Sequence, residues 1–133
     1  LTPDGKPCYC GKTGCADAYC SARLLSDLSG GRLEDFFLGL QQNNPDYRSV
    51  WDTYLKHLAV VINNLHMILD YDIVLGGYVG SFLSPWLDTI RRLVAEHNTF
   101  EDDGSFVKLC TYQTGAAAYG AAMDVMEEFL RTV

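Results

Sequence analysis

Apolar residues recur along residues 47–69 at the spacing of one helix face. They follow one another at intervals of four and three residues, which at about 100° per residue form a narrow stripe. The residues of the stripe are Trp51, Leu55, Leu58, Ile62, Leu65 and Leu69. The pattern predicts a long amphipathic helix over 47–69 that packs this stripe against a core.

The residues before this helix alternate between breakers and shorter apolar patterns. Prolines and glycines punctuate residues 1–14, which predicts a loop. A helix is expected from about Cys15 to Leu28, ended by Gly30 and Gly31. A second, short helix is expected over 32–42, where "NNP" stops it.

The spacing of apolar residues changes after the long helix. Ile73 to Leu75 form a short continuous apolar run, as expected of a buried parallel strand. The elements expected beyond it are a helix over Ser81–His97, an acidic turn over 98–105, a strand over 106–112, and a closing helix over 114–133 whose small residues permit close packing. Two strands separated by a helix predict a βαβ unit. The expected class is therefore α/β, mostly helical with a short parallel sheet.

Length and charge narrow the possible roles. The chain has 133 residues, 48% of them hydrophobic, enough for the core of one domain. Its formal net charge of -7 repels phosphate backbones, so direct binding of DNA or RNA is not expected. No apolar run approaches the roughly 18–20 residues that span a bilayer. No signal peptide or membrane contact is therefore expected.

The start of the chain and its strand content both favour a fragment of a larger fold. "LTPDGKPC" contains no initiator methionine and reads as the middle of a loop. Two strands alone make a poor sheet. We therefore expect a fragment or a processed chain.

The number of cysteines favours a reducing compartment. Five cysteines is an odd count, whereas secreted disulfide scaffolds are usually shorter, richer in cysteine and even in count. Cys20 and Cys110 lie in otherwise regular elements, where buried free thiols are expected. The expected location is the cytoplasm.

The cysteine-rich loop is a candidate metal site. Cys8, Cys10 and Cys15 follow the spacing C-x-C-x4-C, with glycines at 11 and 14 that let the backbone turn tightly. Thiolates are soft ligands that suit tetrahedral zinc. Free or adventitiously oxidised thiols are the alternative.

A fourth ligand is not evident from the spacing. Cys20 lies five residues after Cys15, which on a helix is about 140° around the axis, so its thiol is expected to point away. The three histidines stand far along the chain, at His57, His66 and His97. His66 flanks the apolar stripe, where a half-buried core residue is expected.

Three segments resemble the ROK family of bacterial repressors and sugar kinases. "CYCGKTGCADAYCS" resembles the element C-x-C-G-x-x-G-C-x-E-x-x-x-S of that family, "DYDIVLGGYVG" its strand and double glycine, and "GAAAYGAAM" its closing helix. The resemblance implies an actin-like ATPase (ribonuclease H-like) fold with two lobes around a cleft. It implies that residues 1–133 are the C-terminal lobe, with a zinc loop over 1–15 and helices with two strands over 16–133. A small zinc-stabilised helical domain with an unrelated binding role is the alternative.

The resemblance also implies site residues. Cys8, Cys10 and Cys15 would hold a structural zinc together with a histidine upstream of Leu1. A family glutamate that hydrogen-bonds the sugar corresponds to Asp17, which is one methylene shorter. The alternative for Asp17 is an acidic residue favoured by the first turn of a helix.

The double glycine, Gly76 and Gly77, corresponds to a contact with the nucleotide. The family's kinases tend to have a small residue next, whereas this chain has Tyr78. A phenol there either blocks the nucleotide or points into the core. The alternative for the two glycines is a tight turn from strand to helix.

Two functions follow from the resemblance. In the first, the chain belongs to the effector-binding and oligomerisation region of a sugar-responsive transcriptional regulator. Its partners would be a sugar or sugar-phosphate effector, a second copy, and DNA only through an absent N-terminal domain. In the alternative, the parent is an ATP-dependent, glucokinase-like sugar kinase that uses ATP and Mg²⁺. No catalytic residue is assigned here, because the catalytic aspartate and the phosphate loop would lie upstream.

Overall fold

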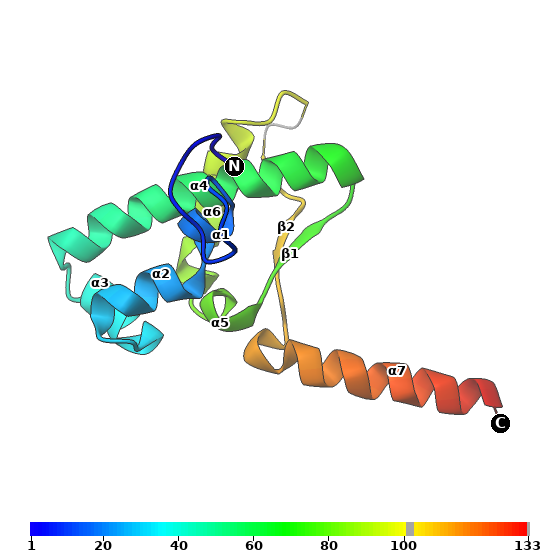
Figure 1. The fold of residues 1–133 in the computed structure, drawn as a ribbon. Helices are drawn as coiled ribbons and strands as arrows, with labels where there is room; N and C mark the ends of the chain where they lie inside the picture. The colour runs from blue at the N-terminus through cyan, green and yellow to red at the C-terminus, as the bar shows by residue number, and fades with distance from the viewer. Residues whose placement is uncertain (101–102, 133) are drawn as a thin grey trace.

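The long helix α4 (Pro45–Leu69) is the central element of the computed structural model, which describes residues 1–100 and 103–132 (Figure 1). Its start is capped: the Asn44 side chain accepts hydrogen bonds from the backbone N–H groups of Asp46 and Tyr47. Pro45 occupies the first turn, where a missing N–H is harmless. The helix predicted over 47–69 is confirmed and begins at Pro45.

The buried face of α4 departs from the predicted stripe near its end. Trp51, Leu55 and Ile62 are buried, as predicted. Leu65 and Leu69 are exposed, and the last buried residue of the helix is His66. Its ring stacks on Phe106 with 3.5 Å between ring centroids, and its Nδ1 lies 2.9 Å from the Tyr71 carbonyl oxygen.

The region expected as one helix over Cys15–Leu28 is broken, and that prediction was wrong. It contains α1 (Asp17–Cys20), α2 (Ala22–Ser26) and the 3-10 helix η1 (Asp27–Ser29). Ser21 separates α1 from α2, because it is extended (φ -86, ψ 152) and its side chain accepts from the Leu24 backbone N–H to cap α2. The short helix that follows is confirmed as α3 (Leu33–Gln41).

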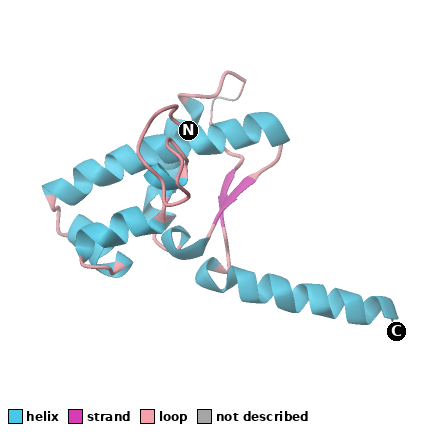
Figure 2. Ribbon diagram, viewed as in Figure 1, coloured by secondary structure: helices cyan, strands magenta, loops and turns pink. Residues whose placement is uncertain are grey.

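A two-stranded parallel sheet follows α4. Strand β1 (Ile73–Leu75) pairs with β2 (Val107–Leu109), and Ile73 lies opposite Val107. The helices α5 (Gly77–Gly80), η2 (Ser84–Trp86) and α6 (Leu87–Ala95) run between the strands, which confirms the βαβ unit (Figure 2).

Two predictions for this unit were wrong. The helix expected over Ser81–His97 begins only at Leu87, because Pro85 lies in η2, where it cannot supply a backbone N–H. Strand β1 is not fully buried, since Val74 is 60% exposed. The strand over 106–112 is confirmed for Val107–Leu109, and within the acidic turn over 98–105 Glu101 and Asp102 lie outside the described residues.

One hydrophobic core joins α2, α3, α4, α6 and the sheet. Its buried members are Leu25, Phe36, Phe37, Leu40, Trp51, Tyr54, Leu55, Ala59, Ile62, Leu83, Ile90, Leu93, Val94, Phe106 and Val107. Aromatic rings concentrate around Trp51, which stacks on Tyr54 and meets the edges of Phe37 and Trp86. The core therefore holds α4 in place between the N-terminal segments and the sheet.

The C-terminal helix α7 (Ala116–Thr132) projects away from this body (Figure 1). The closing helix is confirmed, although Val133 lies outside the described residues. The close packing expected of its small residues is not seen, because none of its described residues is buried. Across residues 1–100 and 103–132, the helices lack the combination of length and apolar character needed to cross a bilayer.

Candidate functional site

The cysteine loop is folded by its own backbone hydrogen bonds. The Cys8 N–H donates to the Lys12 carbonyl at 2.8 Å, and the Gly11 N–H donates to the Cys8 carbonyl at 3.0 Å. Pro7 and Thr13 form an antiparallel bridge. This tight reversal brings residues 8, 10 and 15 close together.

The base of the loop is tied to the N-terminal residues and to α1. Gly14 has φ +72, and an added Cβ would lie 1.8 Å from the Thr2 carbonyl oxygen, so the approach requires glycine. The Lys6 N–H donates to the hydroxyl of Tyr19, a buried residue of α1. The loop therefore has a defined position relative to α1.

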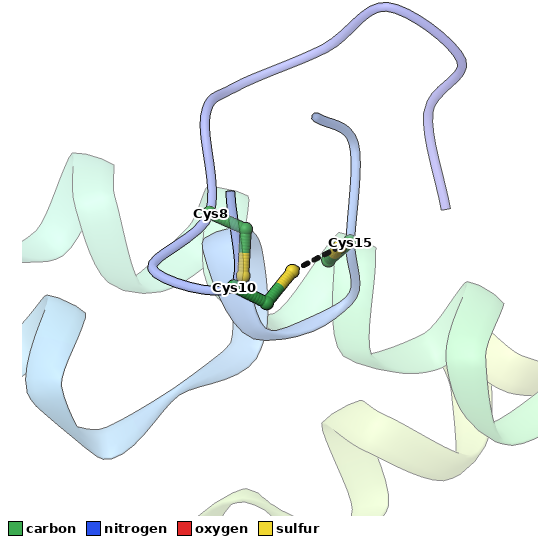
Figure 3. A group of neighbouring side chains, drawn as sticks. All are labelled: Cys8, Cys10 and Cys15. Carbon is green, nitrogen blue, oxygen red and sulfur yellow. Dashed lines mark hydrogen bonds between the residues drawn. The ribbon is translucent and has the colours of Figure 1, made fainter. Parts of the chain in front are cut away.

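The sulfur atoms of Cys8, Cys10 and Cys15 lie within 4.8 Å of one another (Figure 3). The Sγ atoms of Cys10 and Cys15 are 3.6 Å apart. Zinc–sulfur bonds of about 2.3 Å place two sulfurs of a tetrahedral site roughly 3.8 Å apart. The cluster therefore fits a tetrahedral metal, and it is the sole group of three or more His, Cys, Asp or Glu ligands found among the described residues.

The electrostatics of the cluster favour a cation. A hydrogen bond from the Lys12 backbone lowers the pKa of Cys10, which promotes the thiolate form that binds metals. The hydrogen bond with Cys10 raises the pKa of Cys15 to about 11. A divalent cation would lower the pKa of Cys15 again, because it stabilises the thiolates of both cysteines.

The two remaining cysteines, Cys20 and Cys110, are separate from this cluster. Burial raises the pKa of Cys20 to about 11, so this side chain is a neutral thiol at physiological pH. Cys20 and Cys110 are both partly buried free thiols, close to the expectation for them. The three histidines are likewise outside the cluster, as predicted.

Asp17 begins α1, two residues after Cys15, and is joined to the loop. The Tyr9 hydroxyl donates a hydrogen bond to Asp17 Oδ2 at 2.8 Å. This contact with the carboxylate raises the pKa of Tyr9, so the phenol stays protonated. The helix α1 has only four residues, which leaves little macrodipole to account for an acidic residue.

Asp17 lines a cavity of about 390 Å³ between α1, α4 and the β1–α5 turn. The residues that line it are Asp17, Cys20, Ser21, Ala22, Tyr54, Leu58, Val74, Leu75, Gly76, Tyr78, Val79, Gly80 and Leu83. Most of this lining is apolar, with a few polar groups, which is the usual composition of a small-molecule site.

One glycine of the pair lines this cavity. Gly76 lines it, whereas Gly77 is not among its lining residues. Gly77 has φ +72, as a tight turn from strand to helix requires. A Cβ at Gly76 would lie 3.1 Å from the Cys110 Cβ, so the close approach of Cys110 favours glycine at this position.

Tyr78 does not point into the core. Its side chain is 75% exposed and lines the cavity. Of the two alternatives for this residue, the core position is therefore wrong.

Several cavity residues were not singled out from the sequence. Ser21 carried a signal, since a serine before "ARLL" is a common N-cap. Tyr54 lies one turn after Trp51 on the buried side of α4, and its hydroxyl donates to the Cys20 carbonyl. Tyr9, which lies outside the cavity lining, had no such signal in the sequence, because its contact with Asp17 depends on how the loop folds.

Comparison with known proteins agrees with the resemblance of the three segments to the ROK family. The profile of the ROK family matches residues 1–128. The chain belongs to the ROK family. It is also 36% identical over 125 residues to the N-acetylgalactosamine kinase AgaK of Shewanella sp. (strain ANA-3).

The match to this N-acetylgalactosamine kinase is partial. It covers 87% of the chain but 40% of the kinase. The chain therefore spans less than half the length of this relative, which carries the named activity as a whole protein.

Proposed function

We propose that this chain is the C-terminal part of a longer ROK protein with an actin-like ATPase fold, and that its cavity binds a sugar. The observation that carries the proposal is the position of Asp17. It is joined to the cysteine loop through Tyr9 and lies on the same cavity as Gly76 and Tyr78. A carboxylate accepts strong hydrogen bonds from sugar hydroxyls, and an exposed tyrosine ring offers an apolar face for the sugar ring.

The metal in this proposal is zinc with a structural role. Cys8, Cys10 and Cys15 supply three thiolates, and a histidine upstream of Leu1 would complete the tetrahedron. Zinc would hold the loop closed and so fix where α1 begins. The chain's own contribution to sugar binding would then be a preorganised Asp17 carboxylate.

The geometry around Tyr78 favours a sugar-responsive regulator. Its exposed phenol stands beside Gly76, where it would restrict the approach of a nucleotide to the double glycine. The sugar or sugar phosphate would then act as an effector that shifts the protein between two conformations. DNA would be bound by a separate N-terminal domain, since the chain itself carries a net charge of -7. A second copy would cover exposed apolar residues such as Phe129 and Leu130 of α7.

A sugar kinase is the second candidate, favoured by the relative named as an N-acetylgalactosamine kinase. In that case Gly76 and Gly77 would contact ATP, and Mg²⁺ would accompany the phosphates. The aspartate that activates the sugar hydroxyl would come from the other lobe.

Assays of the complete natural protein separate these two functions. We expect N-acetylgalactosamine, N-acetylglucosamine, galactose or glucose to bind without ATP-dependent phosphorylation, and to change the affinity for DNA upstream of its own gene. Phosphorylation of one of these sugars with ATP and Mg²⁺, without any DNA binding, would instead establish the kinase.

Replacement of Asp17 tests the cavity itself. We expect Asp17→Ala to weaken sugar binding by about 10- to 100-fold, the loss expected for hydrogen bonds to a charged group. Isothermal titration calorimetry measures this dissociation constant. Asp35→Ala is the matched control, because Asp35 is an exposed first-turn carboxylate on α3, outside the cavity lining. Equal affinities for the Asp17 and Asp35 variants would contradict the assignment.

A further inference from the structure

Tyr9 lies between two cysteines of the candidate metal cluster. Cys8 precedes it and Cys10 follows it, yet its hydroxyl reaches Asp17 Oδ2 at 2.8 Å. The Tyr9 side chain is 79% exposed, so packing against a core does not hold the ring. The position of the hydroxyl is therefore set mainly by the backbone between the two cysteines.

A metal ion would fix that backbone on both sides of Tyr9. Cys8 and Cys10 would each be bonded to the same ion, which removes most of the freedom of the residue between them. Without the ion, the turn keeps its backbone hydrogen bonds from Cys8 to Lys12 and from Gly11 to Cys8. The covalent restraint on both neighbours of Tyr9 would then be missing, so the residue between Cys8 and Cys10 regains conformational freedom.

The contact with Tyr9 also restricts Asp17. A hydrogen bond to Oδ2 holds the carboxylate in one orientation, and within the described part of the chain Oδ1 makes no hydrogen bond. Asp17 lines the cavity, so its carboxylate keeps one oxygen to accept from a ligand there. Preorganisation of this kind raises affinity, because less conformational freedom is lost on binding.

We propose that Tyr9 is a positioning residue that links the metal site at Cys8, Cys10 and Cys15 to the affinity of the cavity for sugar, through its hydrogen bond to Asp17. Metal occupancy thereby sets sugar affinity without any contact between metal and sugar. This inference rests on the proposed sugar-binding role of Asp17.

The test compares Tyr9→Phe with Tyr71→Phe in the complete natural protein, each zinc-loaded and after removal of the metal with a chelator. Tyr71 is a matched control, because it is 74% exposed and lies outside the cavity lining. Sugar affinity is measured by calorimetry with the tightest binder among N-acetylgalactosamine, N-acetylglucosamine, galactose and glucose. Zinc content is measured by mass spectrometry of the metal.

We expect zinc-loaded Tyr9→Phe to keep full zinc and to bind sugar about three- to tenfold more weakly, as for loss of one hydrogen bond. Tyr71→Phe should match the wild type. Removal of zinc should lower the sugar affinity of the wild type by a similar factor. It should lower the sugar affinity of Tyr9→Phe by little further, because both changes break the same link.

Other outcomes overturn the inference in distinguishable ways. If zinc removal and Tyr9→Phe each lower sugar affinity by an independent factor, so that the two factors multiply, the metal acts by another route. An unchanged affinity in zinc-loaded Tyr9→Phe would overturn it even if the metal-free protein fails to fold. Normal sugar binding by Asp17→Ala, or no binding of any of the four sugars to the wild type, would overturn the proposed function, and this inference with it.

Discussion

Replacement of Cys15 by serine in the complete natural protein is expected to abolish stoichiometric zinc binding. A serine hydroxyl stays protonated at neutral pH and is a poor ligand for zinc beside two soft thiolates. The three sulfurs now lie within 4.8 Å of one another, and removal of one leaves a site with too few donors. We expect zinc affinity to fall by more than about 100-fold, beyond the loss usual for residues that only support a ligand. Metal analysis after extensive dialysis measures the change.

Cys20→Ser is the matched control for this prediction. It makes the same chemical change five residues later, at a neutral thiol outside the cluster. This variant should keep the zinc content of the wild type. One zinc per chain in Cys15→Ser, or its loss from Cys20→Ser, would show that the metal centre has been assigned to the wrong cysteines.

Replacement of Trp51 by alanine is expected to lower the free energy of unfolding of the 133-residue chain by about 3–5 kcal/mol. The indole is fully buried, and its ring lies 5.1 Å from those of Phe37 and Tyr54 and 5.6 Å from that of Trp86. Its removal would leave a cavity where α3, α4 and η2 meet. Urea unfolding followed by far-ultraviolet circular dichroism measures the loss.

Trp51→Phe is the conservative variant at the same position. Trp51 Nε1 is buried and has no hydrogen-bond partner among the described residues, so phenylalanine removes an unsatisfied donor and keeps an aromatic ring. We expect a loss below about 1.5 kcal/mol. Equal losses for the alanine and phenylalanine variants would argue against ring packing as the source of stability.

Local patterns predicted the elements whose formation depends on nearby residues. Apolar periodicity identified α4, the breaker "NNP" identified the end of α3, and the apolar runs after α4 identified both strands of the βαβ unit. The spacing C-x-C-x4-C and the two loop glycines identified the metal cluster, since a tight turn keeps residues so close in sequence close in space. Together with the double glycine, these segments also identified the ROK family.

The errors lie where a single residue or a distant contact changes the outcome. Ser21 separates two short helices because its side chain caps α2, so residues 15–28 do not form one helix. Pro85 delays the start of α6 for a different reason, because it cannot supply a backbone N–H. The exposure of Leu65 and Val74 was beyond local patterns, because burial depends on which elements pack against a face.

The sequence by itself determined the family, the βαβ order, the long helix and the cluster of three cysteines, because each is encoded in residues that are neighbours along the chain. Only the tertiary structure decided that Asp17 and Gly76 share one cavity, that Tyr78 lines it instead of filling the core, and that the Tyr9 hydroxyl reaches Asp17. These relations join segments up to about sixty residues apart, or depend on the direction of one side chain. Periodicity and spacing along the sequence carry no information about contacts between distant segments or about side-chain directions, because both are set when the core packs.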